Sequence, residues 1–230
     1  MDSLIQDVLN ANVVFVGVEL MNRPDARDNL IKAVNAEVMN AEVGFAINAS
    51  GGAPTPSHRF VIPRYRISLD ITSTRSSITK EYLSQTSPSE DLEQLSNVAS
   101  SAICNTIVEG QQLVAYGYNM AIVFSPDLSE PAIQHLGKRL YAPQAHTFGR
   151  EDWDFTGGLG TLYFSDGNRR WTFNMEPRPR EDFGSKRLYI SINLHVDEQE
   201  LPDENAIKCS FEEVLNEANR LMKQLLAESN

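Results

Sequence analysis

Two segments of the chain alternate between apolar and polar residues. Every second residue is apolar between 65 and 72, and the same holds between 187 and 197. Successive side chains of a β-strand point to opposite faces, so this spacing predicts two strands with one buried face each. Runs of β-branched and aromatic residues predict further strands at 13–20, 43–47 and 114–124.

Other segments follow the spacing of an amphipathic helix. From Phe211 to Leu226 the apolar residues recur on one helical face, and the preceding Ser210-Phe211-Glu212-Glu213 matches a capping box. Ser87-Pro88-Ser89-Glu90 predicts a second capped helix in the same way. Shorter helices are expected over Leu4–Leu9, after Asp25 and after Ser129.

A β-hairpin is expected between 161 and 175. Asp166-Gly167 is a strong signal for a two-residue turn. With these two residues in the turn, Leu162 would lie opposite Trp171, and Gly160 opposite Phe173.

The order of the expected elements repeats. Ile67–Ile71 resembles Ile190–Leu194, and the helix starts at Ser87 and Ser210 are separated by the same interval as these strands. The sequence therefore predicts an α+β fold with two similar β-α-β-β-β-α halves, residues 1–110 and 111–230, which form one compact unit. We expect largely antiparallel sheets with amphipathic helices packed on one face.

Two known folds share part of this order. Each half resembles, in the order of its elements only, the vicinal-oxygen-chelate (glyoxalase-like) modules, whose strands supply His, Gln and Glu to a metal. That ligand set is absent: the first strand offers Glu19, its counterpart offers none, and Asp70 aligns with Asn193. Grouping the strands 13–20, 43–47, 60–72 and 113–124 with two helices gives instead a ferredoxin-like order. Neither likeness implies a metal or a cofactor.

Composition narrows the classes of partner. The chain has 31 acidic and 20 basic residues, for a net charge of −11, which argues against nucleic acid and anionic membrane surfaces as partners. It has no apolar run long enough to span a membrane and no signal-peptide pattern at its start, so we expect a cytoplasmic protein. Cys104 and Cys209 are expected to be buried apolar side chains.

Paired arginines are the main candidates for ligand binding. Arg64 and Arg66 would share one face of a strand, and Arg178 and Arg180 repeat the spacing. Arginine binds carboxylate or phosphate through two parallel hydrogen bonds, which points to a small anionic ligand. The alternative is that these side chains, like the pair at 169–170, form ion pairs with surface acids.

Histidines give weaker candidates. His146 stands near Glu151, Asp152 and Asp154, the densest group of possible acid–base residues, but their spacing matches no metal motif. His195 lies on the polar face of its predicted strand. We therefore predict neither a catalytic set nor a metal site.

These observations favour a non-catalytic binding or assembly protein that acts through sheet faces or edges, with a protein partner or as a homo-oligomer. The alternative is an enzyme or sensor for a small anionic metabolite, held by the arginines in a cleft between the two halves.

Overall fold

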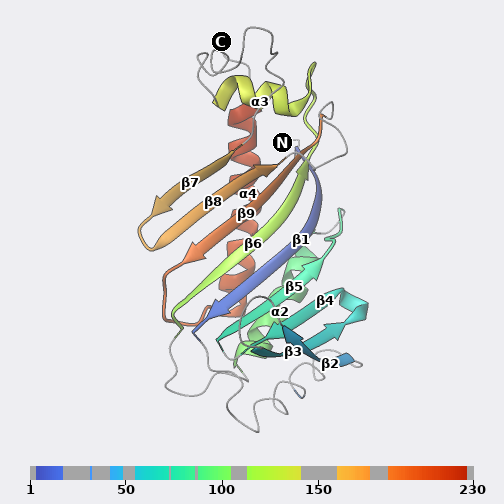
Figure 1. Ribbon diagram of the computed structural model, residues 1–230, viewed down its shortest axis with the longest axis vertical. Helices are drawn as coiled ribbons and strands as arrows, with labels where there is room; N and C mark the ends of the chain where they lie inside the picture. The colour runs from blue at the N-terminus through green and yellow to red at the C-terminus, as the bar shows by residue number, and fades with distance from the viewer. Residues whose placement is uncertain are drawn as a thin grey trace.

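A computed structural model of the chain contains one large antiparallel sheet and a small number of helices (Figure 1). It describes residues 4–17, 32, 42–48, 55–72, 74–85, 88–104, 113–140, 160–176 and 186–226. Within these residues the sheet has nine strands in the order β2-β3-β4-β5-β1-β6-β9-β8-β7. The expected α+β class with a largely antiparallel sheet is confirmed.

The strands are β1 (Ile5–Val16), β2 (Glu42–Asn48), β3 (Thr55–Ile62), β4 (Ile67–Ile71), β5 (Arg75–Glu81), β6 (Ala115–Phe124), β7 (Thr161–Asp166), β8 (Arg169–Glu176) and β9 (Leu188–Val196). The helices are α2 (Pro88–Cys104), α3 (Ala132–Leu140) and α4 (Glu204–Leu226), and a short 3-10 helix, η1, spans Pro63–Tyr65. Of the described helices, none is long and apolar enough to cross a membrane.

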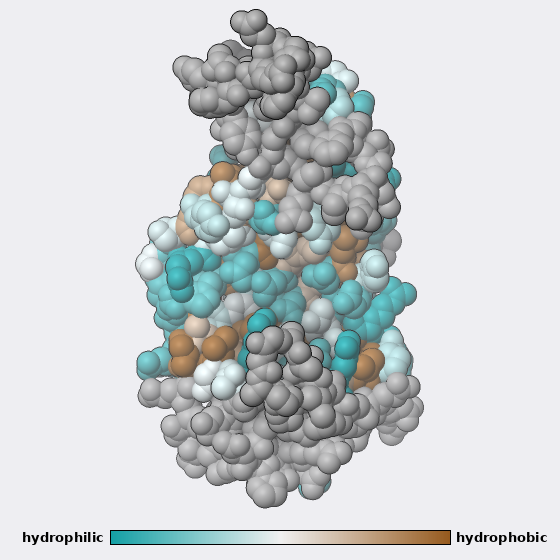
Figure 2. Space-filling model, viewed as in Figure 1, coloured by the Kyte–Doolittle hydropathy of each residue, from teal (hydrophilic) through white to brown (hydrophobic). Residues whose placement is uncertain are grey.

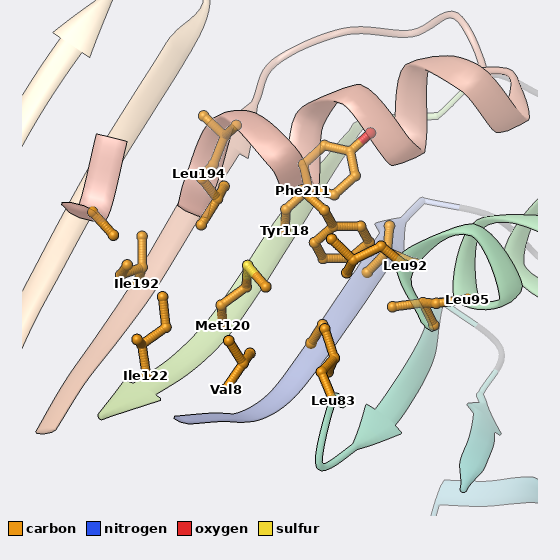
Figure 3. Packing of buried hydrophobic residues seen from close by; sticks show 14 of the residues in the cluster. Val8, Leu83, Leu92, Leu95, Tyr118, Met120, Ile122, Ile192, Leu194 and Phe211 are labelled. Carbon is orange, nitrogen blue, oxygen red and sulfur yellow. The ribbon is translucent and has the colours of Figure 1, made fainter. Parts of the chain in front are cut away.

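Helices α2 and α4 lie side by side on one face of the sheet (Figure 1). The apolar residues of the strands point toward them, and Phe211 of α4 packs edge-on against Tyr118 of β6 with ring centroids 5.1 Å apart. Figure 3 shows that side chains from α2, such as Leu92, join the same cluster. Most of the hydrophobic core therefore lies between the helix pair and this face.

Several sequence predictions are confirmed. Buried and less buried residues alternate along β4 and β9, as their periodicity predicts. Strands β2 and β6 and helices α2 and α3 lie where their patterns place them. The buried residues of α4 include Phe211, Val214 and Ala218, on the predicted apolar face.

The predicted helix over Leu4–Leu9 is wrong, because this segment is the first part of β1. Register shifts at Ile5/Asp7 and Val8/Asn10 interrupt the pairing of β1 with β6. A bulge inserts an extra residue into a strand, so Ile5 and Val8, which pair with Phe124 and Ile122 and contact the same core, stand three positions apart instead of two. That interval imitates the spacing of a helix.

Strand β5 was not predicted. Its sequence, RSSITKE, contains one apolar residue, Ile78, and its helix-facing positions also hold Ser76 and Lys80. Both polar residues are buried, so the period-2 pattern of hydrophobicity is lost. Among the described residues, the first half has five strands, one more than the four of the predicted β-α-β-β-β-α order.

The β7–β8 hairpin forms, but its register differs from the expectation. Asp166 pairs with Arg169, so Gly167 and Asn168 make the turn and Leu162 lies opposite Phe173. Gly167 has a φ of 58°, which glycine adopts without strain. The turn therefore begins one residue later than predicted.

Helix α4 begins earlier than the capping box at Ser210 predicts. The side chain of Asp203 accepts a hydrogen bond from the backbone N–H of Ala206 at 2.7 Å and caps the helix. Ser210 lies inside the helix, where its hydroxyl donates to the carbonyl oxygen of Ala206. The corresponding Ser87 lies outside the described residues.

Strands β1 and β6 lie at the junction of the two sequence halves, with β5 and β9 beside them. The predicted repeat aligns Ile67–Ile71 of β4 with Ile190–Leu194 of β9. In the sheet, β5 separates β4 from β1, whereas β9 lies directly beside β6, so β4 and β9 do not occupy equivalent places. By place in the sheet, β5 is the counterpart of β9.

The expectation of buried cysteines is wrong for Cys209, which is exposed.

Candidate functional site

The predicted arginine clamp does not form on a strand. Arg64 belongs to η1, and Arg66 follows it with a left-handed φ of 52°. Pro63 fixes its own φ and favours a tight turn, so the chain bends here between β3 and β4. Arg64 and Arg66 are exposed and do not alternate along a strand; the guanidinium of Arg64 lies 5.6 Å from the ring centre of Tyr65.

The remaining predicted site residues, His146, Arg178 and Arg180, lie outside the described residues, as do Glu151, Asp152 and Asp154. Among the described residues, no group of three or more His, Cys, Asp or Glu side chains is placed to hold a metal ion.

A row of amide side chains crosses the sheet on the face opposite α2 and α4, which we call the open face. Asn193 of β9 donates to Oδ1 of Asn119 at 2.7 Å, and Asn119 of β6 donates to Oδ1 of Asn12 at 3.1 Å. Asn12 of β1 in turn donates to the hydroxyls of Ser77 and Thr79 on β5, both at 2.6 Å. The row thus links four adjacent strands.

Direct cross-strand pairing explains why these residues meet. Asn12 pairs with Asn119, and Asn119 pairs with Asn193, so their side chains point to the same side of the sheet. Figure 2 shows the open face, whose middle carries a mainly hydrophilic band. A single amide ladder therefore runs through the centre of the open face.

The ladder leads to a pocket of about 430 Å³ over β7, β8 and β9. It is lined by Tyr163, Phe164, Ser165, Arg170, Trp171, Thr172, Asn193 and His195. Phe164 and Trp171 alternate with the open-face residues, so Tyr163 is the aromatic side chain of the lining that belongs to the open face. The pocket therefore offers an amide, a guanidinium, an imidazole and hydroxyl groups within one small area.

Asp197 contacts two side chains of the pocket, His195 and Arg170. Its Oδ1 lies 2.7 Å from Nε2 of His195, and its Oδ2 lies 3.2 Å from a terminal nitrogen of Arg170. The hydrogen bond from His195, together with the nearby charge of Arg170, holds the pKa of the Asp197 carboxyl below its usual value. Asp197 is therefore ionised at neutral pH and orients both groups.

Next to the pocket, β7 ends the sheet, and no strand of the described residues pairs with its outer side. Tyr163 is 76 % exposed and Phe164 is 49 % exposed. The strand, TLYFSD, carries only one charged residue, Asp166, at its end. Natural edge strands are often protected by charges, prolines or bulges, and within β7 only Asp166, at its end, is such a feature.

The alternation of 187–197 placed Asn193 and His195 on a polar face, but the remaining site residues were not recognised as a group. Asn12, Asn119 and Asn193 lie far apart in the sequence and meet only through strand pairing.

No model of a known protein family matches the chain, and no curated protein matches it either.

Proposed function

We propose that the chain is a non-catalytic binding and assembly protein that joins a second copy of itself through the outer edge of β7. The outer edge of β7, with which no described strand pairs, and its half-exposed Phe164 carry this proposal. An unpaired strand offers a row of N–H and C=O groups to any strand that comes beside it.

The apolar layer of the sheet continues to this edge. A row of cross-strand neighbours on the helix-facing side runs Val13, Tyr118, Leu194, Trp171, Phe164. The first four are buried, and Phe164, which packs at a ring distance of 5.9 Å against Phe173, is half exposed because the sheet stops there. An added strand would extend the row and cover this ring.

A second β7 fits this position well. In an antiparallel pair centred on Phe164, the two Phe164 rings would face each other, and Leu162 would face Asp166. Aromatic cross-strand pairs are stabilising. Asp166 is the only charged residue of β7, so each copy brings one charge to the contact, at the end of the strand.

The first experiment measures the molar mass of the protein by light scattering during size-exclusion chromatography. We expect a dimer for the wild type and a monomer for Phe164→Lys. Burial of a half-exposed Phe contributes about 2 kcal/mol per copy, so its loss from a symmetric pair weakens dimerisation about a thousandfold. Val114→Lys is the matched control, because Val114 is an exposed apolar residue (66 %) next to β6 and away from β7.

A strictly monomeric wild type would contradict the proposal, and so would an equal loss of dimer in Val114→Lys.

Cross-linking tests the register of the two β7 strands separately. The starting variant lacks the native cysteines (Cys104→Ser and Cys209→Ser). When Leu162→Cys and Asp166→Cys are added to it together, position 162 of one copy should form a disulfide with position 166 of the other upon oxidation. The single variant Ser165→Cys should not cross-link, because its side chain would face Tyr163 of the other copy.

The alternative function, a small anionic metabolite held by arginines between the halves, stays a prediction, because Arg178 and Arg180 lie outside the described residues. The internal duplication and the division at residue 110 likewise stay predictions.

A further inference from the structure

The pocket over β7, β8 and β9 holds polar groups whose arrangement selects a ligand, independently of assembly through β7. Its side chains on the open face come from two cross-strand rows: Tyr163, Thr172 and Asn193 in one, and Ser165, Arg170 and His195 in the other. Neighbouring strands lie about 4.8 Å apart and alternate residues about 7 Å apart. The polar groups therefore cover an area suited to a small molecule.

The row of Ser165, Arg170 and His195 supplies the positively charged guanidinium of Arg170. Asp197 engages one terminal nitrogen of Arg170 and one ring nitrogen of His195. A guanidinium has five N–H donors, so Arg170 keeps donors for a ligand beside its contact with Asp197. Since Arg170 is paired with Asp197, its orientation is set before a ligand arrives, which favours binding of a carboxylate.

The other row supplies an acceptor. Each amide in the ladder donates toward β5: Asn193 to Asn119, Asn119 to Asn12, and Asn12 to the two hydroxyls. Among the described residues, Oδ1 of Asn193 is the acceptor left at the pocket end of this chain. Successive hydrogen bonds polarise one another, which strengthens the terminal acceptor.

We propose that this pocket binds small hydroxycarboxylates. The carboxylate accepts hydrogen bonds from the guanidinium of Arg170, and a hydroxyl close to it donates to Oδ1 of Asn193. Thr172 pairs with Asn193, and Arg170 pairs with His195, so the two binding groups lie on adjacent residue pairs of β8 and β9. A ligand with a hydroxyl a few bonds from its carboxylate spans this separation.

Isothermal titration calorimetry with malate and with succinate tests the proposal, because these two dicarboxylates differ by one hydroxyl. We expect saturable binding of malate and about tenfold weaker binding of succinate. Arg170→Gln should weaken both ligands about tenfold or more. Asn193→Ala should weaken malate to the level of succinate and thereby remove the discrimination.

Arg59→Gln is the matched control, since Arg59 is a half-exposed arginine of β3 that pairs with Asp70 at 3.8 Å, away from the pocket. Malate affinity should be unchanged in this variant. Absence of saturable malate binding, equal affinities for malate and succinate, or an equal loss in Arg59→Gln would each overturn the proposal. If Asn193→Ala does not fold, Arg170→Gln still decides, because it alters an exposed side chain.

Discussion

The hydroxyl of Tyr118 is a polar group within the apolar layer between β6 and α4. Tyr118 is fully buried, and its hydroxyl makes no hydrogen bond of good geometry to the described residues. The Ser210 hydroxyl acts to lower the pKa of Tyr118, but it donates its proton to the carbonyl oxygen of Ala206. Burial is the larger effect and raises the pKa of Tyr118 to about 12.

Replacement of Tyr118 by Phe should therefore leave the free energy of unfolding at neutral pH unchanged or raise it by up to about 1 kcal/mol, because an unpaired buried hydroxyl is removed. The variant should also lose less stability in alkali. Between the unfolded pKa of 10.0 and the folded pKa of about 12, the wild-type unfolded state releases a proton that the folded state retains, so its stability falls as the pH rises.

Urea unfolding at pH 8 and at pH 11 measures this difference. Burial also raises the pKa of Tyr116, whose hydroxyl donates to Glu198 at 2.7 Å, so Tyr116 adds to the alkaline loss in both proteins. A variant that is much less stable than the wild type at pH 8 would show that the Tyr118 hydroxyl has a stabilising partner.

At the scale of elements, a buried ion pair joins β5 to α2. The ammonium of Lys80, whose side chain is 4 % exposed, lies 2.9 Å from Asp91 and donates to the carbonyl oxygen of Tyr65 and to Gln94. Asp91 also accepts from the backbone N–H of Ser84, just before the helix. These contacts fix α2 over a strand that has few apolar side chains of its own.

Asp91→Ala should destabilise the protein by about 3–5 kcal/mol, because it leaves the Lys80 charge buried without its counterion. Addition of Lys80→Met should restore much of this loss, since no charge then remains in the interior. Chemical denaturation of the two variants measures both effects. A loss below about 1 kcal/mol for Asp91→Ala would show that water reaches Lys80 and compensates its charge.

At the scale of the whole molecule, the two sequence halves share one sheet and one apolar cluster. β1 and β6 pair along most of their length, and Val13 and Tyr118 at their junction are fully buried. Separation of the halves would expose this junction and break the amide ladder between Asn12 and Asn119.

We therefore expect a single cooperative unfolding transition for the full chain. Far-ultraviolet circular dichroism, which follows the backbone, and near-ultraviolet dichroism, which follows aromatic packing, should give the same midpoint in urea. Two separated transitions would indicate that residues 1–110 and 111–230 unfold as independent domains.

Sequence periodicity alone determined the elements whose apolar residues repeat without interruption. The alternation in β4 and β9 and the helical face of α4 were predictable because one face of each packs on the core. Local signals also located the hairpin, although its register depended on which residues made the turn.

Only the tertiary structure decided the rest. β1 is a strand because β5 and β6 flank it and because bulges disturb its period, and β5 is a strand although Lys80 and Ser76 occupy its buried positions. The amide ladder and the pocket depend on which strands become neighbours. Strand order is set by contacts between residues distant in sequence, and a local pattern of hydrophobicity carries no information about these contacts.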